Sequence, residues 1–295
     1  MAWPEPAALQ SLEARVERAL GGAGPGDLTL LGFGEISPVL RLDAGGEAYA
    51  CKRLPPFRET AQLAAYRRCL EDYLGALGRL GVRVLPTALL DLERAGGRVA
   101  YVVQPVVPAE SLLPAVLARA SLPEAVALFG RVVDAVERAV GARLGLDGQV
   151  SNWAVVEGGL AYLDVTTPML RDEAGAERLD TELFIASLPW ALRGLVRRVL
   201  LSEILDKYYE PRGVVLDALA NLFKERLERL LPALVESASA RLVPAITLDE
   251  VRRTYVADAR MWRLLQQLRS LDRAWHRVRG RVYPFLLPER IERHV

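Results

Sequence analysis

The chain divides into a strand-rich beginning and a mainly helical remainder, and this division limits the folds available to it. Apolar segments of strand length occupy residues 28–42, 48–54 and 98–107, with one amphipathic helix predicted over 58–80. Helical periodicity covers most of the other residues, over 5–21, 111–143, 181–207, 214–239 and 248–280. Strands and helices segregated in this way predict two lobes with a ligand cleft between them.

One short stretch, residues 145–168, carries three polar residues in a pattern that predicts a binding site. Two apolar runs, WAVV and LAYLDV, are separated by Glu157-Gly158-Gly159, which predicts a β-hairpin with a tight turn. Asp147 and Asn152 precede the first strand and Asp164 ends the second, so the hairpin brings all three to one end. Their oxygens suit a hard cation such as Mg²⁺ bound alongside phosphates. The alternative is that Asp and Asn merely flank turns, as they commonly do.

Composition excludes several classes of protein. Of 295 residues, 51% are apolar and 25% charged, as in ordinary globular proteins, and no run approaches the roughly 20 apolar residues of a membrane span. The N-terminus lacks the basic n-region of a signal peptide. The only cysteines are Cys51 and Cys69, and the only histidines are His276 and His294. These counts argue against a disulfide framework, a zinc site and a Ser-His-Asp triad, and we expect a cytoplasmic protein.

Lysine is rare, which draws attention to Lys52. Only Lys52, Lys207 and Lys224 contribute lysines to the 38 basic residues. In a chain that prefers Arg, a retained Lys indicates chemistry that needs a compact ammonium group. Lys52 follows a Gly32-x-Gly34 pair, which is neither a dinucleotide fingerprint nor a P-loop, because a strand follows it and no Gly-Lys-Ser/Thr does. The alternatives are a lysine on a strand edge and an ordinary hairpin turn.

Taken together, these segments resemble the protein-kinase-like fold, and most closely its aminoglycoside phosphotransferase and choline-kinase branch. The resemblance covers about residues 28–170 by motif and the rest only in outline. The motifs that carry it are, in order, GFGEIS at 32–37, Lys52 in YACKR, Glu71 in EDYLGALGRLGVRVLP, Asp147-x-x-x-x-Asn152, and Asp164 in YLDVT. It implies an α+β, bilobal fold. A small antiparallel sheet with one helix would occupy residues 1–105 and a large, mostly helical lobe residues 106–295, joined near Pro105 and Pro108.

The resemblance also implies an ATP- and Mg²⁺-dependent phosphotransferase. The residues expected to bind the nucleotide are Gly32, Gly34, Ser37, Lys52, Glu71, Gln104 and Val106. Asn152 and Asp164 would hold Mg²⁺, and Asp147 would accept or orient the proton of the attacking hydroxyl. The acceptor is expected to be a small molecule or a Ser/Thr of a biosynthetic peptide.

Some residues depart from the pattern of that branch. Its catalytic loop reads HGDLHPGN, whereas residues 145–152 here read GLDGQVSN, so the loop-supporting histidines are absent while the metal ligands are kept. No APE-type motif follows, which argues against a regulated protein kinase. The retained Lys, Asp and Asn favour an active enzyme over the alternative, a nucleotide-binding pseudokinase that acts as an interaction scaffold. For Glu71 the alternative is a solvated helix face beside Arg67 and Arg68.

The C-terminal residues 241–295 hold 12 Arg and 6 Asp or Glu, with Trp262, Trp275 and Tyr283 between them. One interpretation is a surface for nucleic acid or an acidic peptide. The near-neutral chain, with a net charge of +1, favours a helix whose aromatic residues pack while its arginines face water. We therefore expect neither a nucleic-acid nor a membrane partner. Glu203 and Asp206 are predicted to lie on a solvated helix face in preference to a pocket for a cationic substrate.

Overall fold

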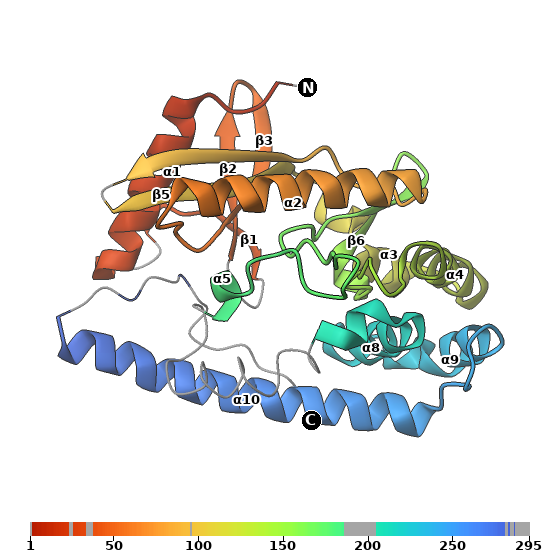
Figure 1. Ribbon diagram of the computed structural model, residues 1–295. Coiled ribbons are helices and arrows are strands. Elements are labelled where there is room, and N and C mark those ends of the chain that lie inside the picture. Colours follow the sequence, from red (N-terminus) through yellow and green to blue (C-terminus); the bar gives the residue numbers. More distant parts are fainter. Residues whose placement is uncertain are drawn as a thin grey trace.

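The computed structural model describes residues 2–23, 26–33, 38–94, 96–185, 205–280, 283 and 286. The fold class is α+β, as predicted, with an antiparallel five-stranded sheet of order β1-β2-β3-β5-β4 and a separate hairpin, β6-β7 (Figure 1). The strands are β1 (Leu30–Phe33), β2 (Pro38–Ala44), β3 (Glu47–Arg53), β4 (Ala88–Arg94), β5 (Gly97–Pro105), β6 (Trp153–Val156) and β7 (Gly159–Tyr162).

Helices make up most of the remaining described residues. The α-helices are α1 (Pro6–Arg18), α2 (Thr60–Arg79), α3 (Leu113–Arg119), α4 (Leu122–Ala139), α5 (Glu182–Ile185), α8 (Pro211–Lys224), α9 (Leu231–Ser239) and α10 (Leu248–Val278). Shorter helical turns are η1 (Ala19–Ala23), η2 (Ala109–Ser111), η3 (Val150–Asn152), η5 (Lys207–Tyr209) and η6 (Glu228–Leu230). None of the described helices has both the length and the apolar character needed to span a membrane.

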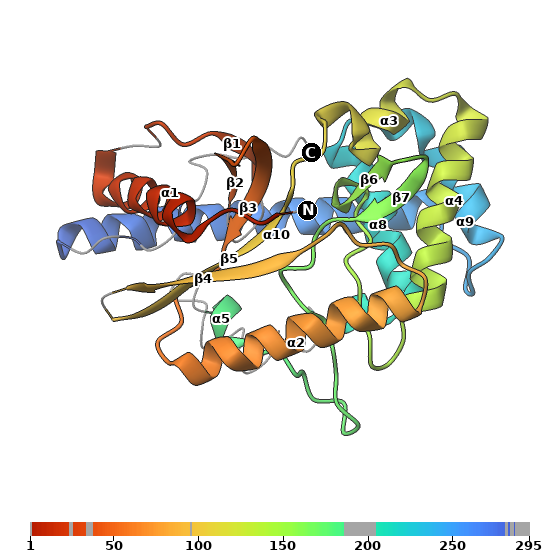
Figure 2. The ribbon, with the colours of Figure 1, turned by 90° about the horizontal axis from the view of Figure 1, so that it is seen from above.

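The two-residue period of strand side chains explains how the sheet is covered on both faces. In β5, Tyr101 and its neighbours at 99 and 103 pack with α1, whereas Ala100 and Val102 join the core that contains α2. Figure 2 shows α1 and α2 on opposite sides of the sheet. In β3 the same alternation places Cys51 in the cluster with α1, so Lys52 emerges on the face that α2 covers.

A buried ion pair fastens α1 to the sheet. The Glu13 carboxylate is fully buried and accepts hydrogen bonds from Arg53 Nε and Nη2 at 2.9 and 2.8 Å. The Tyr101 hydroxyl donates to the same carboxylate. Burying a charge is costly unless it is paired and hydrogen-bonded, and here both carboxylate oxygens have partners. Because Arg53 follows Lys52, this contact also fixes the end of β3.

Helix α2 begins and ends where local signals predict. Glu59 and Gln62 form a capping box at its N-terminus, and Gly81, with a φ of 72°, follows its C-terminal turn. The predicted range of 58–80 is therefore confirmed to within two residues. The buried side chains of α2 form one stripe along the helix: Leu63, Tyr66, Cys69, Leu70, Tyr73 and Leu77.

Two helical segments that were predicted as continuous are divided. The 111–143 pattern becomes η2, α3 and α4, because Ser121 is extended (ψ 160°) and starts α4 through a capping box with Glu124. The 214–239 pattern is interrupted between α8 and η6, where Arg226 takes a φ of 58°. In both cases a local cap or turn ends a helix inside an unbroken apolar pattern. Most of the predicted 181–207 helix, including Glu203, lies outside the described residues.

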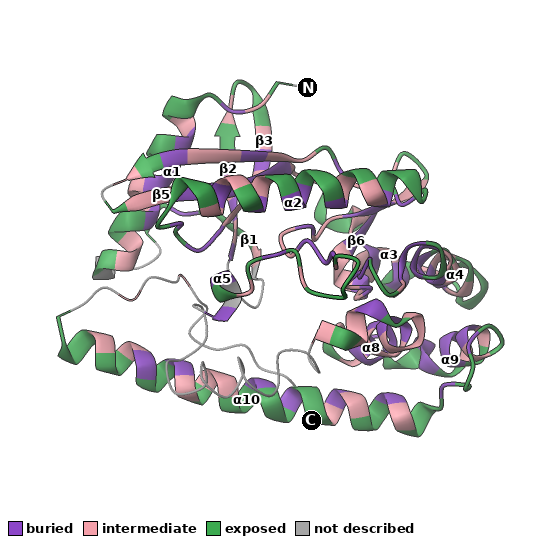
Figure 3. Cartoon of the chain, in the orientation of Figure 1, coloured by how far each residue is buried: buried purple, intermediate pink, exposed green. Residues whose placement is uncertain are grey.

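The predicted C-terminal helix is confirmed as the 31-residue α10, which packs on α8 and α9 and runs on below the sheet (Figure 1). Its start is capped by Thr247, whose side chain accepts the backbone N–H of Glu250. One face is buried along its length, as Figure 3 shows, and Tyr255 stacks on Phe223 of α8 at 5.0 Å between ring centroids. Trp262 is buried as the packed-aromatic interpretation requires, whereas Trp275 is 46% exposed.

We predict that Glu13→Gln lowers the free energy of unfolding by about 3 kcal/mol, because it leaves Arg53 buried without its ion pair. Urea unfolding followed by circular dichroism measures the change. The matched control is Glu17→Gln on the same helix, which breaks only a surface contact with Arg94 and should cost less than about 1 kcal/mol. Equal effects of the two substitutions would contradict the importance assigned to the buried pair.

Candidate active site

Lys52 and Asp164 form an ion pair that joins the sheet to the segment after the hairpin. The Nζ of Lys52, in β3, lies 2.9 Å from Asp164 Oδ1, and the two side chains are only 18% and 30% exposed. Asp164 stands two residues beyond β7, the strand that pairs with β6 around a Glu157-Gly158 turn of positive φ. The predicted hairpin is therefore confirmed, and it delivers Asp164 to the predicted Lys.

The Asp164 carboxylate is held ionised by its surroundings. Thr166 donates to Oδ1 from its hydroxyl at 2.6 Å and from its backbone N–H at 3.3 Å. Burial opposes ionisation, but Lys52 and the Thr166 hydrogen bonds outweigh it and lower the pKa of Asp164. The result is a fixed anion beside a partly exposed ammonium group.

Asn152 stands next to Asp164 through the backbone of the hairpin. Its carbonyl accepts the N–H of Leu163, one residue before Asp164, at 2.8 Å. Its side-chain Nδ2 donates to the carbonyl of Asp147 at 3.3 Å, which leaves Oδ1 with no hydrogen-bond partner among the described residues. The side chains of Asn152 and Asp164 are thus two hard oxygen donors on neighbouring stretches of backbone.

Asp147 lies in the loop before η3 and is partly buried. The Gln149 N–H donates to its Oδ1 at 3.1 Å. Burial, followed by the negative charges of Asp217 and Asp164, raises the pKa of Asp147 to about 7. A carboxyl with a pKa near neutrality has the proton affinity of a general base.

Close packing holds the Asp147 loop in place. A Cβ on Gly148 would lie 2.6 Å from Val214 Cγ1 of α8, so only glycine allows this approach. On the other side, α2 donates hydrogen bonds from Tyr73 to the Gly145 carbonyl (3.1 Å) and from Tyr66 to the Thr166 carbonyl (2.9 Å). The loop and the Asp164 segment are therefore supported by helices from both parts of the chain.

The other predicted site residues are not gathered around the Lys52–Asp164 pair by any contact among the described residues. Glu71 is exposed on α2, and the structure does not bring it to Lys52, whose ion pair is with Asp164. Gly32 is in β1 opposite Val39, beside a β-bulge, with open space around its Cα. Gly34 and Ser37 lie outside the described residues. Asp206 is exposed and pairs with Arg171, which agrees with the solvated-face interpretation.

The predicted connector follows β5. Gln104 is buried and donates from Nε2 to Thr87 Oγ1 at 3.0 Å. The Val106 N–H donates to the Ala48 carbonyl at 2.9 Å, which extends the pairing between β3 and β5 to the end of the sheet. Both residues thus lie at the C-terminal end of β5, the strand that pairs with the Lys52 strand.

Sequence reasoning missed several supporting residues. Tyr66 and Tyr73 were not singled out, although their spacing of seven puts them on the buried stripe of α2. Gln149, Lys207 and Asp217 were also missed as neighbours of Asp147; the scarcity of Lys was the signal for Lys207. No pattern in the sequence pointed to Asp217, because its position depends on how α8 packs.

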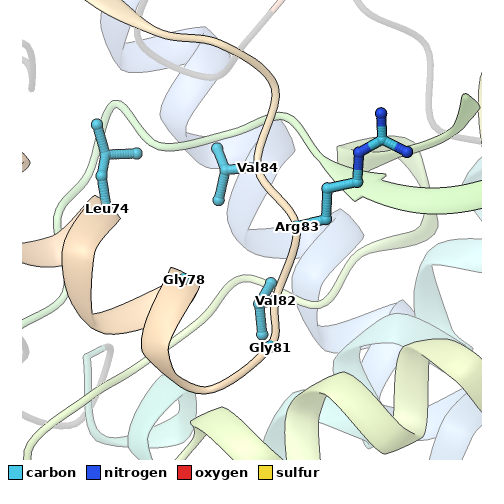
Figure 4. Close-up of a pocket in the computed structure, with 6 residues that line it drawn as sticks. All are labelled: Leu74, Gly78, Gly81, Val82, Arg83 and Val84. Carbon is cyan, nitrogen blue, oxygen red and sulfur yellow. The ribbon is translucent and has the colours of Figure 1, made fainter.

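Two further observations concern the metal ligands of the site and the position of a pocket. Within the described ranges, no three His, Cys, Asp or Glu side chains gather to hold a metal, so Asn152 and Asp164 would need oxygens from a ligand. A pocket of about 430 Å³ lies at the C-terminal end of α2, with Arg83 turned away from Val82 (Figure 4). None of the predicted site residues lines this pocket, so it is separate from the Lys52–Asp164 pair.

We predict that Asp147→Asn stabilises the metal-free protein at pH 8. The folded-state pKa of about 7 lies above the ordinary value of 3.8, so stability from this carboxyl is full below pH 3.8 and is lost as the pH rises through 7. Asn keeps the acceptor oxygen for Gln149 and should raise the free energy of unfolding by about 1–3 kcal/mol at pH 8, but hardly at pH 4. Unfolding in EDTA at both pH values measures this.

Asp249→Asn, at an exposed carboxyl, serves as the control and should show no such pH dependence. Identical pH profiles for the wild-type protein and Asp147→Asn would contradict the raised pKa.

A comparison with family models identifies a family for this chain. Residues 11–273 match the model of DUF6206, described as a family of unknown function. The match includes every predicted site residue from Gly32 to Asp164. A comparison with curated proteins finds no match. Because the matched range spans most of its residues, the chain belongs to the DUF6206 family.

Proposed function

We propose that this protein is an ATP- and Mg²⁺-dependent phosphotransferase that acts on a hydroxyl of a small molecule or of a Ser or Thr in a biosynthetic peptide. The observation that carries the proposal is the Lys52–Asp164 pair, with Asn152 and Asp147 beside Asp164. Phosphoryl transfer needs a cation for the phosphates, oxygen ligands for a metal and a group that orients the attacking hydroxyl. These four residues offer that set.

Each side chain has a role that follows from its surroundings. Lys52 extends from a strand with its side chain 18% exposed, so its ammonium group can turn from Asp164 to phosphate oxygens. Asp147 has a pKa of about 7 and can accept a proton from a hydroxyl at neutral pH. Helix α2 would position this set through Tyr66 and Tyr73, whose hydroxyls hold the backbone on either side.

The residues present fit Mg²⁺. Asn152 Oδ1 and the Asp164 carboxylate would hold the ion, and both are the hard oxygen donors that Mg²⁺ selects. When bound, Mg²⁺ would neutralise charge on the phosphates and align them for transfer. The lowered pKa of Asp164 keeps that ligand deprotonated at neutral pH.

The finer fold assignment belongs to the same proposal. The sheet order, with α2 between β3 and β4 and a connector after β5, supports a bilobal kinase-like fold with lobes at 1–105 and 106–295. We also propose that the protein is cytoplasmic. Its partner would be the small-molecule or peptide acceptor, and neither nucleic acid nor a membrane would be a partner. The paired cysteines needed for a disulfide framework are lacking, and Cys51 and Cys69 are both free and buried.

A second candidate is a nucleotide-binding pseudokinase that acts as a scaffold. The exposed position of Glu71 favours it, because Lys52 then lacks the helix glutamate that the resemblance implies. The retained Asp147, Asn152 and Asp164 favour the enzyme. The two candidates differ in turnover and agree on nucleotide binding.

We predict that ATP with Mg²⁺, at about 100-fold excess over Kd, raises Tm by roughly 5 °C more than ATP with EDTA. Lys52→Ala and Asp164→Asn should lose this shift, because they remove the phosphate cation and a metal ligand. Lys224→Ala, at an exposed lysine, is the matched control and should keep it. Differential scanning fluorimetry measures all four proteins.

Turnover separates the two candidates. The enzyme should hydrolyse ATP slowly in Mg²⁺, and Asp147→Ala should abolish turnover while the Mg²⁺-dependent Tm shift remains. Nucleotide binding without hydrolysis or transfer would favour the scaffold. A wild-type protein that binds no nucleotide would contradict both.

A further inference from the structure

A second ion pair, between Lys207 and Asp217, acts on Asp147 through its charges. Lys207 Nζ, in η5, is 2.9 Å from Asp217 Oδ1 of α8. The Asp217 side chain is only 12% exposed, and Lys207 also lies over the Tyr208 ring. Two of the three lysines of the chain thus pair with aspartates whose charges act on Asp147. The role proposed above uses Lys52 and leaves Lys207 unexplained.

Gln149 connects this second ion pair to Asp147. Its side-chain Nε2 donates to Asp217 Oδ2 at 3.1 Å, and its Oε1 accepts from Asn221 Nδ2 at 3.3 Å. Its backbone N–H donates to Asp147 Oδ1 at 3.1 Å. The residue that holds the Asp147 carboxylate is therefore itself held at both ends of its side-chain amide by α8.

The residue before Asp147 is hydrogen-bonded to η5, the turn that carries Lys207. The Leu146 N–H donates to the Tyr208 carbonyl at 3.0 Å, immediately after Lys207. A Cβ on Gly145 would meet that carbonyl at 3.0 Å, and a Cβ on Gly213 would meet the Lys207 carbonyl at 2.8 Å. The loop, η5 and the start of α8 are thus in close contact, and the Lys207–Asp217 pair links η5 to α8.

We infer that Gln149, Asp217 and Lys207 are positioning residues for Asp147. Asp217 fixes the Gln149 side chain, Gln149 aims the Asp147 carboxylate through its N–H, and Lys207 keeps Asp217 in place as a paired anion. This inference rests on the proposed function for its catalytic consequence. The anchoring itself rests only on the contacts of the loop, and it can be tested without turnover.

The first measurement is hydrogen exchange of the free protein by mass spectrometry. Gln149→Leu and Lys207→Met should speed exchange in peptides that cover residues 145–152, with exchange in β3 and α2 unchanged. Gln267→Leu and Lys224→Met, at exposed positions in α10 and α8, are the matched controls. Lys207→Arg should restore the wild-type exchange, because it keeps a cation beside Asp217. Unchanged exchange in the loop would overturn the inference whatever the protein catalyses.

The second measurement is Mg²⁺-dependent ATP hydrolysis. Gln149→Leu and Lys207→Met should lower kcat roughly 10- to 100-fold, the effect of a small misplacement, with KM for ATP within about twofold. A loss that appears in KM, or follows a fall in Tm, would assign the three residues a merely structural role and overturn the inference. If the loop exchanges faster in the variants but the wild-type protein neither binds nor hydrolyses ATP, the anchoring is supported and the proposed function fails.

Discussion

The contact between Lys52 and Asp164 is the interaction on which the site depends. It brings together a cation from the middle of the sheet and an anion delivered by a hairpin far along the chain. A partly buried pair of this kind forms only if the strand register, the hairpin turn and the packing of α2 are all correct. Because burial alone would raise the pKa of Asp164, the ion pair with Lys52 and the hydrogen bonds from Thr166 are what keep this carboxylate charged at neutral pH.

The surroundings of Asp147 raise its pKa, whereas those of Asp164 lower the pKa of that carboxyl. Burial and two other aspartates make its ionised form costly, and the Lys52 and Lys207 ion pairs flank it without contacting its carboxylate directly. Perturbed carboxyls of this kind are typical of functional sites, where stability is given up for chemistry. The loop around Asp147 is supported by hydrogen bonds from the Gln149 N–H to Asp147 and from the Tyr73 hydroxyl to the Gly145 carbonyl.

The parts of this site whose position depends on local sequence signals could be predicted. Turn chemistry at Glu157-Gly158 was enough to place Asp164, and the scarcity of lysine was enough to single out Lys52, whose partner Asp164 was not predicted. Glu71 was chosen by its motif, although the apolar stripe through Tyr66 and Tyr73 already put it on the solvent side of α2. The Gln149–Asp217 contact could not be predicted, because it depends on how α8 approaches Gly148, and no local pattern records that packing.

The most direct test is a crystal structure with Mg²⁺ and a non-hydrolysable ATP analogue. We predict a metal about 2.0–2.1 Å from Asn152 Oδ1 and an Asp164 carboxylate oxygen, and Lys52 Nζ turned to the phosphates. Asp147 should stand apart from the metal with its carboxylate towards the terminal phosphate. Nucleotide bound elsewhere, or a Lys52–Asp164 pair unchanged with no metal beside it, would contradict the proposed site.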